Sequence, residues 1–322
     1  MLKRIDIKNS KFFRRATKKL KNYPFLFKWI RRILHLVKMV PPKHPCMEDG
    51  DYFFRLFSSH QNINSISFKK GLVRGEFKGT SYLLKIHPQS MIESCVYLDG
   101  IWEPHIAEMI AGYLQNSRDI VIDVGANIGA TSIPLAKHFP QAQFYLYEPH
   151  PLVFENLRNN VSYNKLSNVY AHNAAITNSV NKSLPFYAQK NTHNFGLSGF
   201  KLNHDIEHYD VIDVDCLSLD SIFLNNEGSI KLIKIDTQGH ELEVLLSAKK
   251  IIIRDRPVIL FEFESEYFES KSDESETKKA LIQFFEGLNY EIFMNNAEFK
   301  FMPRVTLKAY FHGDIIAVPL AT

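Results

Sequence analysis

The pattern of apolar and polar residues changes at residue 119. From there on, short runs of consecutive apolar residues alternate with stretches of helical spacing. Consecutive apolar positions are typical of strands covered on both faces, and their alternation with helices predicts a parallel, doubly wound α/β sheet. We expect strands over "DIVIDV", "QFYLYE", "NVYAHNA", "IKLIKID", "PVILFEF", "YEIFM" and "DIIAV".

Two other regions have different patterns. Between about residues 52 and 100, alternating stretches such as "SISF" and "SYLLKI" are broken by Gly71, Gly75 and Gly79, which predicts β-hairpins. "EPHIAEMIAGYL" then has helical spacing. Within residues 175–228, "LPFYAQ" and "YDVIDVDCLSLDSI" indicate an inserted pair of strands and a short helix, which serve as a lid, a substrate wall or a covering for the sheet.

The N-terminal segment differs from the rest in charge. Residues 1–40 carry 13 Lys or Arg and one acid, Asp6, so their charge is +12; since the whole chain carries +4, the remainder carries −8. The stretch "PFLFKWIRRILHLVKMVPP" is too short between charges to cross a bilayer. As a helix it would be amphipathic, with Trp29 on the apolar face. Two interpretations stay open: a helix in a membrane interface, or one packed on the protein's own core.

These patterns divide the 322 residues into three parts. Residues 1–50 form a basic amphipathic extension, residues 51–118 hold β-hairpins and a helix, and residues 119–322 form the α/β domain. The cysteines Cys46, Cys95 and Cys216 show no CxxC pairing, which argues against a disulfide frame or a zinc ribbon and suits a reduced, cytoplasmic compartment.

Polar residues recur where the predicted strands end. Ligands of doubly wound sheets bind at the carboxyl ends of the strands. The strand ends expected here are Asp123, Glu148, Asn173, Asp236 and Glu262.

The stretch "DVGANIG", residues 123–129, predicts a glycine bend between a strand and a helix. It is neither the GxGxxG of a dinucleotide fold nor the GxxxxGK of a phosphate loop. Gly125 and Gly129 would let the backbone approach a ligand, and Glu148 would accept hydrogen bonds from both hydroxyls of a ribose. A nucleoside without a bulky phosphate fits, because no Lys is present in the bend to neutralise one. S-adenosylmethionine has that shape, and Asp123 would face its cationic end.

The segment 230–252, "IKLIKIDTQGHELEVLLSAKKII", places Asp236 at a strand end and Gly239 in a tight turn. Glu241 follows in the first turn of a helix, where an acid favours the helix dipole. Glu241 is therefore either a helix-start residue or a site residue, whereas Asp236 beside the ligand crevice is costly unless it is used.

Taken in order, "DIVIDVGANIG", "LYEPHPLVFENLRNN", "NAAIT", "LSLDSI", "LIKIDTQGHELEVLLSA" and "PVILFEFE" resemble the FkbM family of S-adenosylmethionine-dependent methyltransferases, over roughly residues 100–300. The resemblance implies a class I, Rossmann-like methyltransferase fold and methyl transfer, most often to a hydroxyl oxygen of polyketides or sugars. It implies that the cofactor is held by Asp123, Gly125, Asn127, Gly129 and Glu148, to which we add Asn173 from its strand end. Asp236, Gly239 and Glu241 match the family's second block.

The chain departs from the family pattern near the acceptor side. Gln238 stands where an acid is usual, His240 and Ser247 where small residues are usual, and Glu264 where His is frequent. These departures leave the fold and the cofactor expectation intact. They bear on the identity of the acceptor and of the base.

Methyl transfer to a sugar hydroxyl needs alignment of the acceptor and a base for its proton. The candidate catalytic residues are Asp236, His240 and Glu262, of which we rank Asp236 and His240 first. Asp236 would alternatively position the methionine amino group. No metal is expected, because no second Asp or Asn ligand follows Asp236 closely.

The predicted function is therefore O-methylation of a hydroxyl on a glycan or other small acceptor. We also expect residues 1–42 to bind peripherally to the inner face of an anionic membrane. One alternative is a nucleic-acid methyltransferase with a basic arm, although an NPPY-type base-flipping motif is absent. Another is a binding module that has lost catalysis, suggested by Gln238 and His240. A nicotinamide enzyme is disfavoured by the GxxxG spacing.

Overall fold

The structure is a computed structural model that describes residues 71–86, 96, 101–114, 118–190, 198–201, 206–268, 270–295, 301–303 and 313–320. The basic segment 1–50, its predicted amphipathic helix and the stretch "SISF" lie outside the described residues. The chain divides into two compact units, residues 1–102 with 192–194, and residues 103–191 with 195–322. Among the described residues, no helix combines the length and apolar character needed to span a membrane.

In the first unit, the described residues form one antiparallel hairpin. Strand β1 (Leu72–Phe77) pairs with β2 (Thr80–Lys85) through a turn in which Lys78 and Gly79 both have positive φ, 46° and 80°. The expected hairpin is thus confirmed over this stretch. Gly75, however, lies inside β1 opposite Tyr82 and does not break the strand.

The second unit contains an eight-stranded sheet in the order β12-β11-β13-β10-β9-β3-β4-β5. Its parallel strands are β3 (Ile120–Val124), β4 (Gln143–Tyr147), β5 (Val169–His172), β9 (Ile230–Ile235) and β10 (Val258–Phe263). Strands β11 (Tyr290–Asn295), β12 (Phe301–Pro303) and β13 (Gly313–Pro319) pair in antiparallel fashion. All seven expected strands are confirmed, and β12 is an addition. The mostly parallel, doubly wound α/β fold is confirmed as well.

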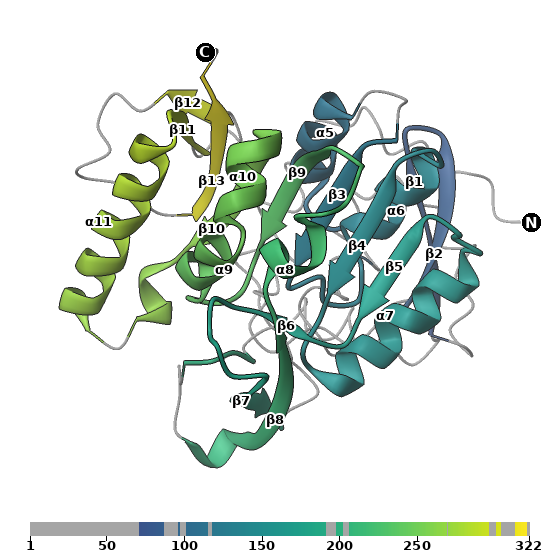
Figure 1. The fold of residues 1–322 in the computed structure, drawn as a ribbon. Helices are drawn as coiled ribbons and strands as arrows, with labels where there is room; N and C mark the ends of the chain where they lie inside the picture. Colours follow the sequence, from purple (N-terminus) through teal and green to yellow (C-terminus); the bar gives the residue numbers. More distant parts are fainter. Residues whose placement is uncertain are drawn as a thin grey trace, which may run out of the picture. The chain divides into compact units, whose positions relative to one another are not determined.

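Helices cover both faces of this sheet (Figure 1). On one face, α5 (Pro104–Tyr113) packs against α6 (Ser132–His138), and α7 (Pro151–Tyr163) contacts β5. On the other face, α8 (Leu219–Phe223) packs on α9 (Glu241–Ser247) and α10 (Lys249–Asp255), and α11 (Lys271–Gly287) contacts α9. Two short 3-10 helices cover Ile206–His208 and Ser265–Tyr267. The expected helix in residues 103–114 is confirmed and belongs to this second unit.

The strand order explains where a site forms. The chain builds β3, β4 and β5 outward in one direction and then returns to add β9 on the other side of β3. Loops from β3 and β9 therefore diverge at their carboxyl ends, and this switch point is where doubly wound sheets bind ligands. All five residues of β3 are buried, because helices cover both faces there.

The insertion between β5 and α8 forms a three-stranded sheet beyond the carboxyl ends of the central strands (Figure 1). Strand β8 (Tyr209–Leu217) pairs antiparallel with β7 (Ser183–Gln189) and parallel with the short β6 (Ala175–Ile176). The expected strand pair and short helix are confirmed. Leu219 and Phe223 of α8 are fully buried in the core of the main sheet, so this helix covers the sheet.

Candidate cofactor and acceptor site

The loop after β3 is held against β9 by the backbone itself. Asp236 N donates to Val124 O at 2.9 Å, and Gly125 N donates to Tyr147 O at 2.9 Å. Gly125 has φ 79°, and a Cβ there would lie 1.9 Å from the carbonyl oxygen of Asp236. Glycine is therefore required at this position by the approach of two strands.

The second glycine of the bend is also packed against the protein. A Cβ on Gly129, which has φ 82°, would lie 2.7 Å from Ile133 Cδ1 and 2.8 Å from Leu157 Cδ1. We expected both glycines to admit a ligand to the backbone. The structure differs in this respect, because the positions where Cβ atoms would stand face a neighbouring strand and two helices.

Glu148 closes the loop after β3 onto the loop after β4. Its Oε2 accepts from Asn127 N at 2.9 Å, and its Oε1 accepts from His150 N at 2.9 Å. Asn127 itself has φ 52°, a left-handed conformation that Asn tolerates better than most residues. Burial raises the pKa of Glu148 to about 7, although the two backbone bonds oppose that shift. Each carboxylate oxygen has a second lone pair available for a ligand hydroxyl.

Asn173 stands directly after β5, as predicted. Its Nδ2 donates to the carbonyl oxygens of Glu148 and Pro149 at 2.8 and 2.9 Å. Asn173 therefore ties the end of β5 to the loop that carries Glu148, while the residue as a whole stays exposed.

A buried lysine that we did not predict lies at the centre of the site. The β3–β9 register places Lys234 opposite Asp123, and Lys234 Nζ lies 3.4 Å from Asp123 Oδ1 and 3.3 Å from Asp236 Oδ2. Asp123 also accepts a 2.5 Å hydrogen bond from Ser132 Oγ. We expected Asp123 to face the cationic end of the cofactor, but its carboxylate already faces this ammonium. The strand sequence IKLIKI contains two lysines, Lys231 and Lys234, and only the structure shows that Lys231 is exposed and Lys234 is buried.

Glu241 has a structural role in the turn between β9 and α9. Its side chain is buried, and Oε1 accepts from Thr237 N, Thr237 Oγ1 and Gly239 N, each at 3.1 Å. The carboxylate thereby fixes the turn between β9 and α9, where Gly239 has φ 93°. Of the two interpretations left open, these contacts favour the helix-start role.

Glu262 is the acid at the carboxyl end of β10. Burial, together with the negative charges of Asp236 and Asp314, raises the pKa of Glu262 to about 9. Tyr267 Oη donates to Glu262 Oε2 at 3.1 Å. Gln238, with φ 57°, donates from Nε2 to Asp236 Oδ1 at 3.4 Å. The structure thus brings Asp236 and Glu262 into one cluster.

His240 is the N-cap residue of α9, and its imidazole ring packs against an aromatic side chain. Its ring centroid lies 4.5 Å from that of Phe200, and its Nε2 is buried without a hydrogen-bond partner among the described residues. Burial, helped by the charge of Lys201, lowers the pKa of His240 to about 4. The imidazole is therefore neutral at pH 7 and a weak base.

Four carboxylates, those of Asp123, Glu148, Asp236 and Glu262, interact electrostatically at this end of the sheet. One ammonium, Lys234, is buried among them. The balance is negative in a region of low solvent access, and such a site favours a ligand with positive charge. The side chains present therefore fit the sulfonium and ammonium of S-adenosylmethionine.

The sheet order and the acidic strand ends define a class I methyltransferase. The family model for the methyltransferase FkbM domain matches residues 123–292, more than half of the chain. The chain belongs to this family, and the expectation that its cofactor is S-adenosylmethionine is confirmed at that level.

Individual relatives are more distant. Methyltransferase 1 of Beauveria bassiana is 27% identical over 142 residues, which cover 39% of this chain and 56% of that protein. A tRNA(Phe) (4-demethylwyosine(37)-C(7)) aminocarboxypropyltransferase of Methanocaldococcus jannaschii is 37% identical over 57 residues, 18% of this chain and 23% of its own length. The chain thus spans about half or less of the curated relatives it matches.

Among solved structures, the FkbM methyltransferase from Methylobacillus flagellatus KT superimposes with a TM-score of 0.38 and 16% identity. The alignment covers 64% of this chain and 45% of that one.

Proposed function

We propose that this chain transfers the methyl group of S-adenosylmethionine to a hydroxyl oxygen of a sugar or glycan. The observation that carries the proposal is the cluster of four carboxylates at the switch point of the sheet, two of which, Asp123 and Asp236, pair with Lys234. Membership of the FkbM family supports methyl transfer, and the family resemblance supports a hydroxyl acceptor.

The cofactor contacts follow from the positions of these groups. Glu148 accepts from the two ribose hydroxyls, and Asn127 and Gly129 shape the bend beside it. Asn173 borders the nucleoside end through its link to Pro149. Asp236, held by Lys234, binds the methionine end.

S-adenosylmethionine, when bound, supplies an electrophilic methyl group on a positively charged sulfur. The residues of the chain must orient the acceptor and take its hydroxyl proton. Asp236 is already engaged in an ion pair with Lys234 at 3.3 Å, and we assign it to the methionine end instead. His240 is a poor base, since its pKa is lowered to about 4.

Glu262 is the best-matched base among the three candidates. Its pKa of about 9 reflects burial among other carboxylates, so its ionised form accepts a proton readily. A cation bound nearby lowers that pKa toward neutrality and makes the ionised form available at working pH. Tyr267 positions the carboxyl group through its 3.1 Å hydrogen bond.

The proposal is tested with methyl-labelled S-adenosylmethionine and a panel of sugars, oligosaccharides and polyketide alcohols. We expect label in a saccharide, with a mass gain of one methylene. Asp236→Asn should lower turnover. The fold of this variant and its stabilisation by the cofactor are measured in parallel. A gain corresponding to an aminocarboxypropyl group, or label only in nucleic acid, would overturn the proposal.

A cellular experiment complements the enzyme assay. Deleting the gene should remove one methyl group from a sugar of the cell's glycans, detected by mass spectrometry. Restoring the wild-type gene should bring the methyl group back, whereas the Asp236→Asn gene should not. Unchanged glycans after deletion argue against a glycan acceptor.

A further inference from the structure

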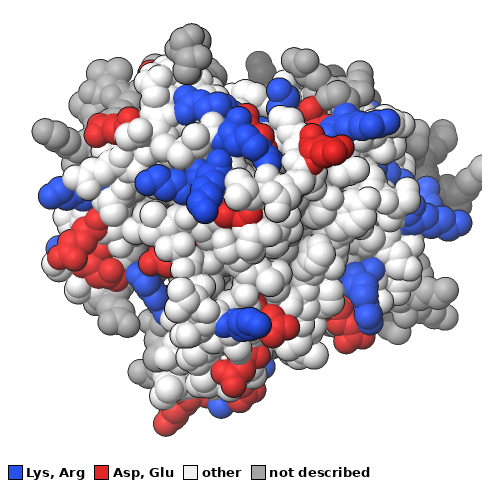
Figure 2. Space-filling view, in the orientation of Figure 1, with Lys and Arg blue, Asp and Glu red and all other residues white. Residues whose placement is uncertain are grey.

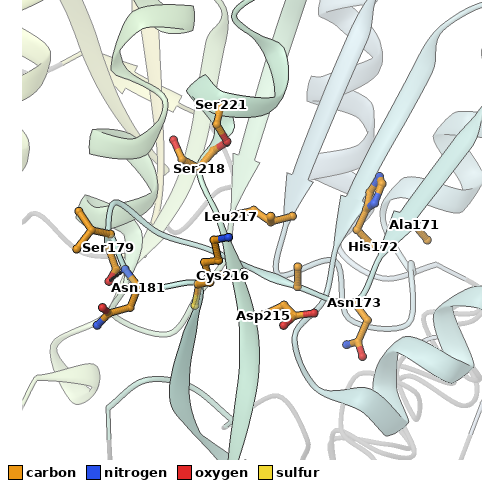
Figure 3. A pocket seen from close by; sticks show the side chains of 13 residues that line it. Ala171, His172, Asn173, Ser179, Asn181, Asp215, Cys216, Leu217, Ser218 and Ser221 are labelled. Atoms are coloured by element: carbon orange, nitrogen blue, oxygen red, sulfur yellow. Dashed lines mark hydrogen bonds between the residues drawn. The ribbon is translucent and has the colours of Figure 1, made fainter.

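A cavity of about 770 Å³ lies between the end of β5 and the insertion (Figure 3). It shares Asn173 with the proposed cofactor site, but none of the four carboxylates of the cluster lines it. Its walls come from residues 171–174, residues 179–182 and the segment from Asp215 to Ser221. Most of its polar lining groups are neutral amides and hydroxyls, from Asn173, Ser179, Asn181, Ser218 and Ser221. Such groups both donate and accept hydrogen bonds.

The cavity carries no net charge from its Lys and acidic side chains. Among the described residues, Lys182 and Asp215 are the only charged ones that line it, and their charges cancel. Burial lowers the pKa of His172, so its imidazole is neutral at pH 7. The surface over β4 and β5 is largely uncharged in the space-filling view (Figure 2). A phosphate-bearing ligand would require several Lys or Arg, so this lining favours a neutral one.

Two aromatic rings extend the cavity along β5. The β4–β5 register places Tyr170 opposite Tyr145 and His172 opposite Tyr147. The first pair stacks at 4.8 Å with an interplanar angle of 22°, and the second at 5.0 Å with 16°. We call Tyr170 and His172 the aromatic shelf.

The shelf has one ring face available to a ligand. Strand β5 is the edge of the eight-stranded sheet, so the tyrosines of β4 support only one side of the two rings. Tyr170 remains 41% exposed and His172 is also exposed. The rings are thus already ordered by stacking, and a ligand packing on them loses little side-chain entropy.

We propose that the cavity and the aromatic shelf together bind a neutral oligosaccharide. A sugar ring offers an apolar C–H face, which packs against an aromatic face, and a rim of hydroxyls, which match the neutral amides and hydroxyls of the cavity. The inference rests on the proposed glycan acceptor. It assigns a chain-binding groove that lies outside the methyl-transfer centre.

The distance between the two places constrains the acceptor. Strand β5 is separated from β9 by β4 and β3, so three strand spacings, or roughly 14 Å, lie between the groove and Asp236. The proposed base Glu262 lies on β10, one strand further still, so a single sugar residue cannot occupy the shelf and also present its hydroxyl at Glu262. The groove therefore selects an acceptor of several sugar units over a monosaccharide.

The test uses the full chain and a panel of neutral hexasaccharides of glucose, mannose and N-acetylglucosamine, screened by calorimetry with S-adenosylhomocysteine present. At least one hexasaccharide should bind, and Tyr170→Ala should weaken it by about five- to tenfold, since an aromatic contact is lost. Tyr170→Phe should bind as wild type. Tyr163→Ala is the matched control, because Tyr163 is 43% exposed at the end of α7 and is not one of the residues that line the cavity.

Asn181→Ala is a second variant. Asn181 lies in an exposed loop, so this substitution should leave the fold intact. It should weaken the same hexasaccharide while S-adenosylhomocysteine affinity stays unchanged. Three outcomes would each overturn the proposed saccharide groove. The first is an equal effect of Tyr170→Ala and Tyr163→Ala, the second is no effect of Asn181→Ala, and the third is binding of an oligoribonucleotide at the shelf. Loss of cofactor affinity in the Tyr170 or Asn181 variant would overturn it too, since the cavity would then belong to the cofactor site.

The groove and the proposed reaction fail in different ways. If a hexasaccharide binds as expected but is never methylated, the reaction is wrong and the groove stands. If monosaccharides are methylated as fast as hexasaccharides and the groove variants change neither, the groove is wrong and the reaction stands.

Discussion

At the residue scale, the site depends on acids whose pKa values are raised by burial. Glu148 and Glu262 both carry their shifts because desolvation penalises the ionised form. The two acids differ in their partners. Both acids face other negative charges, but Glu148 accepts two backbone hydrogen bonds that lower its pKa, whereas Glu262 accepts one hydrogen bond from Tyr267. This difference explains why the pKa of Glu262 is the higher of the two.

Cofactor binding should depend on pH through Glu148. Its ionised form accepts the ribose hydroxyls, so binding favours ionisation and releases a proton. Because its pKa in the free protein is about 7, affinity should rise about tenfold between pH 6 and pH 8. Calorimetry in buffers of different ionisation enthalpy measures the proton release. Glu148→Gln should remove the change in affinity centred near pH 7 and leave only the proton released by Glu262. A variant that retains the full change would remove Glu148 from the ribose site.

Turnover should depend on pH through Glu262. For a general base the ionised form is active, so kcat/KM should increase with pH up to about 9, the pKa in the free protein. The kcat profile should increase at lower pH, because the bound cation stabilises the ionised acid. Glu262→Gln should remove the rising limb and cost on the order of 100-fold in kcat. Glu276→Gln on α11 is the control, and equal losses in both variants would contradict the assignment.

At the scale of elements, the contact between β3 and β9 organises the site. The register sets Asp123 beside Lys234, and the 2.9 Å bond from Asp236 N to Val124 O continues the pairing past the strand ends. Both the charge cluster and the glycine bend therefore depend on the same two strands lying close together.

Gly125→Ala tests that contact. The new Cβ would meet the Asp236 carbonyl oxygen at 1.9 Å, at a φ of 79° that Ala disfavours. We expect a loss of more than about 4 kcal/mol in the free energy of unfolding, measured with urea. Gly112→Ala is the matched control, because Gly112 lies in α5 with no atom within 4 Å of the added Cβ. Gly112→Ala should stabilise the protein by up to about 1 kcal/mol. A Gly125→Ala protein as stable as the Gly112→Ala protein would refute the packing argument.

At the scale of the whole molecule, charge is divided unevenly along the chain. The +12 of residues 1–40 contrasts with −8 over the remainder. The segment lies outside the described residues, so its proposed role rests on sequence. We propose that residues 1–42 hold the enzyme at the inner face of an anionic membrane, where a lipid-linked saccharide would be its acceptor.

Vesicle flotation tests this placement. Each basic residue near an anionic surface contributes about 1 kcal/mol, so the full chain should float with anionic vesicles at low salt. Deleting residues 1–42 should abolish flotation and leave the melting temperature unchanged. A nucleic-acid arm would ignore vesicles and release nucleic acid steeply as salt rises. An arm packed on the enzyme would bind neither and would lower the melting temperature when deleted.

The sequence alone determined the strands, the doubly wound sheet and the row of polar strand ends. Apolar runs report burial on both faces, and this signal is local. The acids Asp123, Glu148, Asp236 and Glu262 could be placed at one edge because carboxyl ends of parallel strands share that edge. The family motifs then sufficed to predict the cofactor.

Only the tertiary structure decided how these side chains use one another. Lys234 lies 111 positions from Asp123 in the sequence, and only the β3–β9 register brings their charges to 3.4 Å. Our proposal of Glu262 as the base also rests on the fold, because burial and neighbouring charges, which no local pattern encodes, lower the pKa of His240 and raise that of Glu262. Desolvation depends on every element packed around a group, so it is settled only when the whole chain has folded.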